Sequence, residues 1–317
     1  MPKMYLHQHS AYNDLLRIVG DQLRILPALI EKDYWIMHVL YGLTKQGFVF
    51  ELKGGTSLSK GYKIIDRFSE DIDIYIHPPS GRKVEENPKK EKAQDINSRR
   101  EYFQWLTNEI KIEGITSIER DHLYDNETLT SAGIRLHYDT VTEPVPGLKP
   151  GILLEAGFAT VTPNERLSIG SWALDRAMTT APDEIIDNTA TGIACYHPGY
   201  TLVEKLQNIV RKYRKEQETG EPNPNYMRQY YDVSRLLLRS DIKAFIGTAE
   251  YLKHKADQFR GKDKKIVLAE NPAFLLPDPN QRENFSTRYA GTANLYYNGQ
   301  PPFEELLTII QKALPGL

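Results

Sequence analysis

The stretch from Lys53 to Asp73, KGGTSLSKGYKIIDRFSEDID, constrains the fold of this 317-residue chain more than any other. It leads into Asp71–Ile76, where two aspartates and a tyrosine alternate with three isoleucines. Because successive side chains of a strand point to opposite faces, this alternation predicts a half-buried strand with both aspartates on one face. The β-branched and aromatic segment Phe48–Leu52 predicts another strand just before the Gly-Gly turn.

The residue types in this stretch indicate phosphate and metal chemistry. Two carboxylates on one strand face, Asp71 and Asp73, can bind the same divalent cations, and Mg²⁺ prefers such oxygen ligands. The glycines of Gly54–Ser57 let backbone N–H groups approach a polyphosphate, and the start of a short helix predicted over Ser57–Ile65 favours an anion by about 0.3–1 kcal/mol. We therefore expect a metal-dependent nucleotidyl-transfer site.

A third carboxylate is expected on a further strand, because two-metal phosphoryl transfer uses ions roughly 3.5–4 Å apart and needs a ligand on the acceptor side. Glu155, in the strand-like segment ILLEAGF, is the best-placed candidate. An isolated D-x-D pair or a Gly-Gly turn is also common in ordinary strands and turns. The combination, with 13 residues between Ser57 and Asp71, favours the functional interpretation, while a plain strand carboxylate stays open for Glu155.

The rest of the chain predicts an α+β fold, namely a small mixed-sheet core with N-terminal helices and a C-terminal helical lobe. We expect a nucleotidyltransferase lobe over residues 1–178 and a helical lobe over 179–317. Helical spacing appears at Tyr12–Ile25, Pro27–Leu43, Ile96–Ile112, Tyr200–Lys215, Met227–Leu238, Ile242–Asp257 and Phe303–Leu314, and strand patterns appear at Ile115–Arg120, Gly133–Tyr138 and Ile152–Phe158.

Composition excludes several other classes of protein. Lys and Arg total 40 against 42 Asp and Glu, so the net charge alone favours no polyanionic partner. A single cysteine, Cys195, rules out an intrachain disulfide framework and a cysteine-based metal cluster. No segment approaches the roughly 18 apolar residues of a membrane span. We expect a cytoplasmic protein that does not enter a membrane.

Several motifs resemble the DNA polymerase β-type nucleotidyltransferase superfamily, whose signature is a Gly-Gly or Gly-Ser loop followed by a D-x-D pair after a short helix. Within that superfamily the chain is similar to the AbiEii/AbiGii-type toxins, to which the MenT toxins are related. The matching segments are IEKDYW at 30–35, LKGGTSLSKGY at 52–62, RFSEDIDI at 67–74, YTLVEKLQNIVRK at 200–212 and RQYYDVSRLL at 228–237.

The resemblance implies a polymerase β-like core and assigns roles to individual positions. Lys205 would contact the triphosphate, and Asp232 would be the acidic residue of the last motif. From the residues alone, Lys205 could also be an ordinary lysine on an amphipathic helix, and Asp232 could pair with Arg228 or Arg235. The remaining implied residues are Lys53, Gly54, Gly55, Thr56 and Ser57 for the nucleotide, and Asp71, Asp73 and Glu155 for two Mg²⁺ ions, with Mn²⁺ as a substitute.

The resemblance also implies an activity. The chain would move a nucleoside monophosphate from a nucleoside triphosphate to an acceptor hydroxyl of RNA, with the 3′ end of tRNA as the expected acceptor. It would act as a toxin with a cognate antitoxin, in abortive infection and phage defence. Two alternatives stay open: a regulator that binds GTP or another nucleotide without transfer, and nucleotidylation or phosphorylation of a protein.

Overall fold

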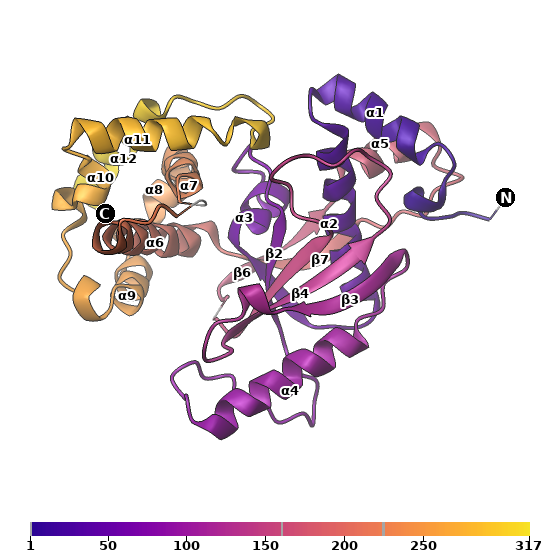
Figure 1. Ribbon diagram of the computed structural model, residues 1–317, viewed down its shortest axis with the longest axis horizontal. Helices are drawn as coiled ribbons and strands as arrows, with labels where there is room; N and C mark the ends of the chain where they lie inside the picture. Colours follow the sequence, from indigo (N-terminus) through magenta and orange to yellow (C-terminus); the bar gives the residue numbers. More distant parts are fainter. Residues whose placement is uncertain (1, 160, 224–225) are drawn as a thin grey trace. The chain divides into compact units, whose positions relative to one another are not determined.

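The computed structural model describes residues 2–159, 161–223 and 226–317, which form two compact units (Figure 1). The first unit is the chain up to Tyr62 together with Phe68–Tyr196, and the second is Lys63–Arg67 together with His197–Leu317. The five residues Lys63–Arg67 therefore belong to the second unit, although the residues on both sides of them in the sequence belong to the first. The boundary expected between residues 178 and 179 stays a prediction, and the last strand of the first unit follows it.

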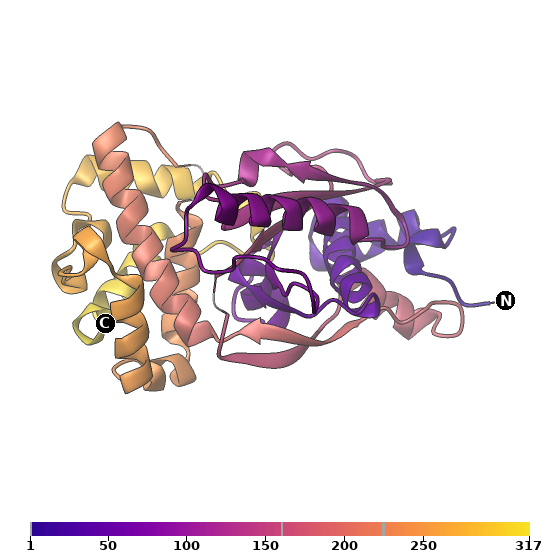
Figure 2. The same ribbon diagram turned by 90° about the horizontal axis from the view of Figure 1, so that it is seen from below.

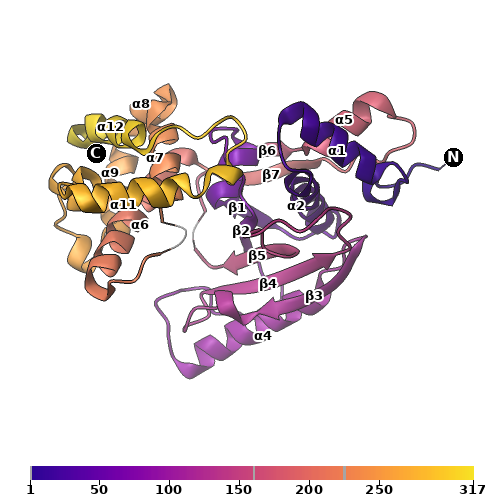
Figure 3. The same ribbon diagram turned by 45° about the horizontal axis from the view of Figure 1, so that its top comes forward.

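A seven-stranded mixed sheet forms the core of the first unit, as the α+β fold class predicts. Its strand order is β3-β4-β5-β2-β1-β7-β6, which Figure 3 shows from β6 to β3. β2 pairs antiparallel with β1 and parallel with β5. The strands are β1 (Phe50–Lys53), β2 (Asp71–Ile76), β3 (Ile115–Asp121), β4 (Ser131–Tyr138), β5 (Ile152–Gly157), β6 (Asn164–Ile169) and β7 (Ala190–Tyr196).

In the first unit, α2 packs against α1, α5 and the strand β7, whereas α4 packs against β3 and α3 against β2. Pro27 occupies the first turn of α2, where a missing backbone N–H costs nothing. Nearly the whole surface of α2 is buried, so it is a core helix rather than an amphipathic surface helix. The helices are α1 (Tyr12–Leu23), α2 (Pro27–Lys45), α3 (Gly54–Thr56), α4 (Ala93–Glu109) and α5 (Trp172–Thr180).

The second unit is helical. Its helix α6 begins with Pro198 and ends at Thr219, and the next residue, Gly220, has a left-handed conformation (φ 70°) that closes the helix. α7 packs against α6 and α12, and α9 packs against α6; Figure 2 shows α6 in salmon beside the orange helices. The helices are α6 (Pro198–Thr219), α7 (Arg228–Leu238), α8 (Ser240–Phe245), α9 (Ala249–Gln258), α10 (Pro272–Leu275), α11 (Pro279–Ala290) and α12 (Phe303–Ala313).

Several parts of the sequence-based assignment are wrong. The single helix expected over Ile242–Asp257 is divided into α8 and α9, because Gly247 adopts a positive φ of 84° and the Thr248 side chain caps the second helix. The elements β6, α5 and β7 were not foreseen, because their apolar spacing is short and irregular. In the described part of the chain, no helix has the length and apolar character needed to cross a membrane.

Candidate active site

Three of the predicted carboxylates lie on the adjacent strands β2 and β5. Asp71 and Asp73 are half-buried on one face of β2, while the intervening Ile72 is fully buried on the other. Asp73 pairs directly with Glu155 in the parallel β2–β5 register. Neighbouring strands are about 4.8 Å apart, so these side chains share one small region of the sheet surface.

The glycine turn lies directly against this region. Gly54 has a positive φ of 70°, and a Cβ atom there would collide with Asp73 Oδ2. Lys53 and Asp73 are partners in the antiparallel β1–β2 register. The Thr56 hydroxyl donates a hydrogen bond to the backbone carbonyl of Asp71 at 2.5 Å. Both aspartates of the pair are therefore joined to the turn, one by packing and one by a hydrogen bond.

The segment after the turn differs from the expected helix over Ser57–Ile65. α3 is only three residues long and continues as a π-helical turn over Ser57–Gly61. Gly55, Thr56 and Ser57 are buried. The Thr56 hydroxyl ties the turn to β2 through its hydrogen bond to Asp71.

Charge repulsion is strongest at Glu155. Burial, followed by the negative charges of Asp73 and Asp71, raises the pKa of Glu155 from 4.5 to about 8. The cations Lys149 and Lys53 oppose this rise only in part. A site of this kind gains stability from any further positive charge placed among its carboxylates.

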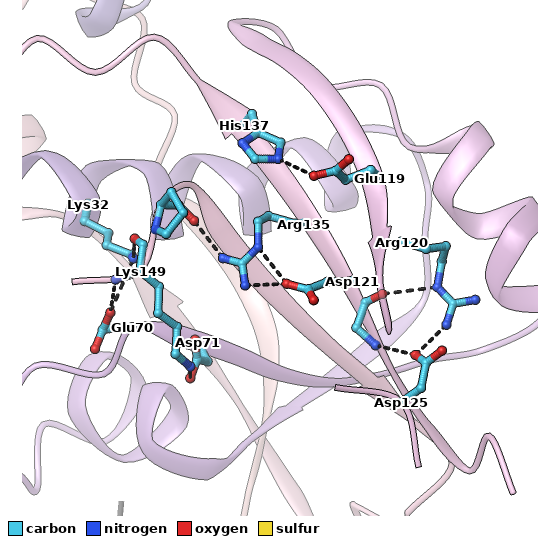
Figure 4. Close-up of polar contacts among 12 residues, drawn as sticks. Lys32, Glu70, Asp71, Glu119, Arg120, Asp121, Asp125, Arg135, His137 and Lys149 are labelled. Atoms are coloured by element: carbon cyan, nitrogen blue, oxygen red, sulfur yellow. Dashed lines mark hydrogen bonds and ion pairs between the residues drawn. The ribbon is translucent and has the colours of Figure 1, made fainter. Parts of the chain in front are cut away.

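The donor atoms suit a hard divalent cation. Asp71 Oδ1 is buried and has no hydrogen-bond partner among the described residues. An unsatisfied buried carboxylate oxygen is unusual, and a bound ion would satisfy it. No three His, Cys, Asp or Glu side chains of the described residues already converge around a metal position. A cation is nevertheless present at Asp71, because Lys149 Nζ lies 2.6 Å from Oδ2 (Figure 4).

Lys149 was not identified from the sequence, and neither were the residues that hold it. Its backbone N–H donates to Glu70 Oε2 at 2.9 Å, and its carbonyl accepts from Lys32 Nζ at 2.5 Å. Lys32 and Glu70 are both buried and form an ion pair at 3.5 Å. Lys32 belongs to the segment IEKDYW, in which the residues before and after it are also buried and charged.

Those two neighbours hold other parts of the same unit. Glu31 accepts hydrogen bonds from the backbone and hydroxyl groups of residues 140–142, in the loop that precedes Lys149. Asp33 binds Lys60 Nζ at 2.5 Å and the backbone N–H of Trp172 at 3.0 Å. The sequence did contain a signal for these contacts, namely three consecutive charged residues inside a largely apolar helix. Because charged groups are buried only when they are paired, such a run indicates ionic or hydrogen-bonding partners elsewhere in the chain.

Lys205 and Asp232 belong to the helical unit, and the structure brings them together. Lys205 Nζ lies 2.6 Å from Asp232 Oδ2 and 3.3 Å from Gln229 Oε1. Arg67, unrecognised in the sequence, donates from Nε and Nη2 to the two Asp232 oxygens, each at 2.6 Å. Burial by itself would raise the pKa of Asp232, but Arg67 and Lys205 outweigh it and lower the pKa to about 2. The partners considered from helical spacing, Arg228 and Arg235, are not the ones in these contacts.

A comparison with protein families agrees with the resemblance noted in the motifs. The model of the family described as "Nucleotidyl transferase AbiEii toxin, Type IV TA system" matches residues 39–309. No curated protein matches the chain. Among solved structures, an antigenic nucleotidyltransferase-like protein from Paracoccidioides brasiliensis is 12% identical, covers 72% of this chain and 87% of its own, and has a TM-score of 0.37.

Proposed function

Because this chain belongs to the AbiEii family of nucleotidyltransferase toxins of type IV toxin–antitoxin systems, we propose that it transfers a nucleoside monophosphate from a nucleoside triphosphate to an RNA hydroxyl. The reaction requires Mg²⁺, and the 3′ end of tRNA is the expected acceptor. Membership of this family implies an antitoxin partner and a nucleotide substrate. The consequence in the cell would be an arrest of translation, in keeping with a role in abortive infection.

One observation carries the proposal: the carboxylate of Asp73 packs against Gly54, with Glu155 beside it on the next strand. A carboxylate pair and a glycine turn in contact can hold the two ends of a metal–triphosphate complex. The buried Oδ1 of Asp71, which has no hydrogen-bond partner among the described residues, supports the same assignment. A turn that served only to reverse the chain would have no need of acidic groups against it.

The proposed chemistry is an in-line displacement. The acceptor hydroxyl oxygen forms a bond to the α-phosphorus, the bond from that phosphorus to the β-phosphate oxygen breaks, and pyrophosphate leaves. Mg²⁺ bound by Asp71 and Asp73 would stabilise the charge that develops on the phosphate oxygens. Glu155, which lies beside Asp73 on the next strand, would accept the proton of the attacking hydroxyl.

Lys205 is the proposed contact to the leaving pyrophosphate. Its ammonium is held by Asp232 and Gln229, so its direction is fixed before a substrate arrives. Asp232 is saturated by Arg67 and Lys205, which favours a positioning role over direct contact with the reacting atoms. Backbone groups of Gly54–Ser57 would bind the triphosphate, with Lys53 at the edge of the turn.

The test uses α-³²P-labelled nucleoside triphosphates with Mg²⁺, total RNA and the purified protein. We expect the label to enter RNA, and we expect Asp71→Asn, Asp73→Asn or removal of Mg²⁺ by chelation to abolish this incorporation. Asp241→Asn, which alters an exposed aspartate of the helical unit, is the matched control and should retain full activity. Periodate oxidation of the RNA, which destroys its terminal 3′ hydroxyls, should also prevent labelling.

Each alternative activity gives a different result in this assay. Label on protein would support nucleotidylation of a polypeptide, whereas protein labelled only when a γ-³²P triphosphate is used would support phosphorylation. Tight nucleotide binding without any label would support a regulator. Full activity in both aspartate variants would refute the metal assignment, and equal labelling of oxidised RNA would refute a 3′-terminal acceptor.

A further inference from the structure

Lys149 forms an ion pair with one carboxylate oxygen of the candidate site. Its ammonium lies 2.6 Å from Asp71 Oδ2, and each of the two side chains is 22% exposed. Figure 4 shows the Lys149 side chain extending from the Glu70 contact to Asp71. The ring of Tyr124 lies beneath the same ammonium, 4.9 Å from its centroid. This lysine therefore has a defined position within the candidate active site.

The loop that carries Lys149 is fixed on both sides of the residue. Glu70 and Lys32 hold the N–H and carbonyl of Lys149 itself. The next carbonyl, of Pro150, accepts a hydrogen bond from Arg135 Nη1 at 2.7 Å. Burial of the Lys32–Glu70 ion pair costs desolvation energy, and these backbone bonds are among the contacts that offset the cost. Such anchoring is unusual for a lysine that has no role beyond the surface.

A divalent cation and an ammonium group compete for the same carboxylate. The ammonium satisfies one oxygen of Asp71, while the other is buried and finds no hydrogen-bond partner in the described part of the chain. A metal ion bound through Asp71 would repel Lys149, and the nucleotide phosphates that accompany the ion would attract it. Because the loop backbone is anchored, the ammonium group of a displaced Lys149 can move only as far as the length of its side chain allows.

We propose that Lys149 is the resident counter-ion of Asp71. When a divalent cation binds this carboxylate, Lys149 releases it and binds a phosphate oxygen of the nucleotide instead. This inference rests on the proposed function, since it takes Asp71 to be a metal ligand. Lys149 would then lower the metal affinity of the protein without nucleotide, and it would also couple metal binding to nucleotide binding. A metal ion without nucleotide would meet competition at Asp71, whereas a metal–nucleotide complex would supply Lys149 with a new partner.

The first experiment measures Mn²⁺ binding without nucleotide, from the electron paramagnetic resonance signal of free Mn²⁺. Lys149→Met should bind Mn²⁺ about tenfold more tightly than the wild type, because a competing charge is removed. Metal-free Lys149→Met should also unfold at a lower temperature, and saturating Mn²⁺ should restore it. The matched control is Lys90→Met, which removes an exposed lysine paired with Glu85 in the same unit and should change neither quantity.

The second experiment measures the affinity for a non-hydrolysable α,β-methylene triphosphate at saturating Mn²⁺. Here Lys149→Met should bind about tenfold more weakly, the opposite direction to its effect on the metal alone. Lys149→Gln, which keeps most of the side-chain length, should reproduce both effects and guards against a folding defect specific to methionine. Circular dichroism checks that each variant is folded.

The results distinguish this inference from the proposed function. If Asp71→Asn loses Mn²⁺ binding while the folded Lys149 variants bind Mn²⁺ as the wild type does or more weakly, the counter-ion role is refuted and the metal site stands. If Asp71→Asn binds Mn²⁺ as the wild type does, both the metal assignment and the counter-ion role are refuted. Tighter metal binding with unchanged nucleotide binding would refute the transfer of Lys149 to the phosphate.

Discussion

Replacement of Asp232 by Asn is expected to destabilise the helical unit by about 2–5 kcal/mol. The Asp232 carboxylate is fully buried and binds both Arg67 and Lys205 at 2.6 Å. Asparagine keeps the size and shape of the side chain, removes its charge and replaces one acceptor oxygen by an NH2 donor. Two buried cations would then face one neutral amide, so the variant isolates the electrostatic contribution from the packing.

The magnitude follows from the ionisation of the group. Burial alone would raise the pKa of Asp232, but Arg67 and Lys205 lower it from 3.8 to about 2. Since one pKa unit corresponds to about 1.4 kcal/mol, the ionised form contributes about 2–3 kcal/mol relative to a neutral group. Removal of one partner of a buried ion pair typically costs about 3–5 kcal/mol, which sets the upper end of the range.

Urea denaturation followed by circular dichroism measures the global effect, and hydrogen exchange with mass spectrometry measures the local one. Peptides covering Lys63–Arg67 and α7 should lose protection in Asp232→Asn. The control, Asp241→Asn, breaks an exposed pair with Arg239 and should cost less than about 1 kcal/mol. The reasoning would be refuted if Asp232→Asn were no more destabilising than this control.

The pH dependence gives a further check on the same variant. Because the folded-state pKa of Asp232 is lowered, the ionised carboxylate contributes fully to the free energy of unfolding above pH 3.8. This contribution is lost as the pH falls towards about 2. The difference in unfolding free energy between wild type and Asp232→Asn should therefore be complete at pH 5 and smaller at pH 3. A difference that stayed constant over this interval would contradict the ionic origin.

Three other outcomes are expected. Glu155→Gln should stabilise the metal-free protein by about 1–3 kcal/mol at pH 9 and hardly at pH 4. The reason is that the wild type loses stability as the pH rises from 4.5 through the folded-state pKa of Glu155, which is about 8. Urea denaturation at the two pH values tests this. Gly54→Ala should lower the stability by about 2 kcal/mol or more and abolish transfer, because its Cβ meets Asp73. The control Gly47→Ala has a similar φ of 82° but open space around the Cβ, and it should lower the stability by about 1 kcal/mol. Thermal denaturation measures both changes. Cys195, whose pKa burial raises to about 12, should react with a thiol reagent at pH 8 only after the protein is unfolded.

Local patterns were sufficient to predict the part of the site that is built from neighbouring residues. The alternation in Asp71–Ile76 determines which side chains face the core, and it places both aspartates on one face. The proximity of Glu155 required only the correct pairing of two strands. These features depend on the periodicity of a strand, which is expressed directly in the sequence.

The contacts missed from the sequence are those made between distant residues. Arg67 and Asp232 are 165 residues apart, and Lys149 and Asp71 are 78 residues apart. Charged residues are common on protein surfaces, so nothing local distinguishes Lys149 or Arg67 from an exposed side chain. Only the charges within the apolar helix α2 gave a usable indication, and their partners could not be named without the fold.

The discontinuous composition of the helical unit limits how this protein can be divided. The backbone passes from one unit to the other after Tyr62, after Arg67 and again after Tyr196. A fragment starting at His197 would lack the guanidinium that neutralises Asp232, so we expect it to be a poor mimic of the intact lobe. Dissection by truncation would have to retain the Lys63–Arg67 peptide, either tethered or added in trans.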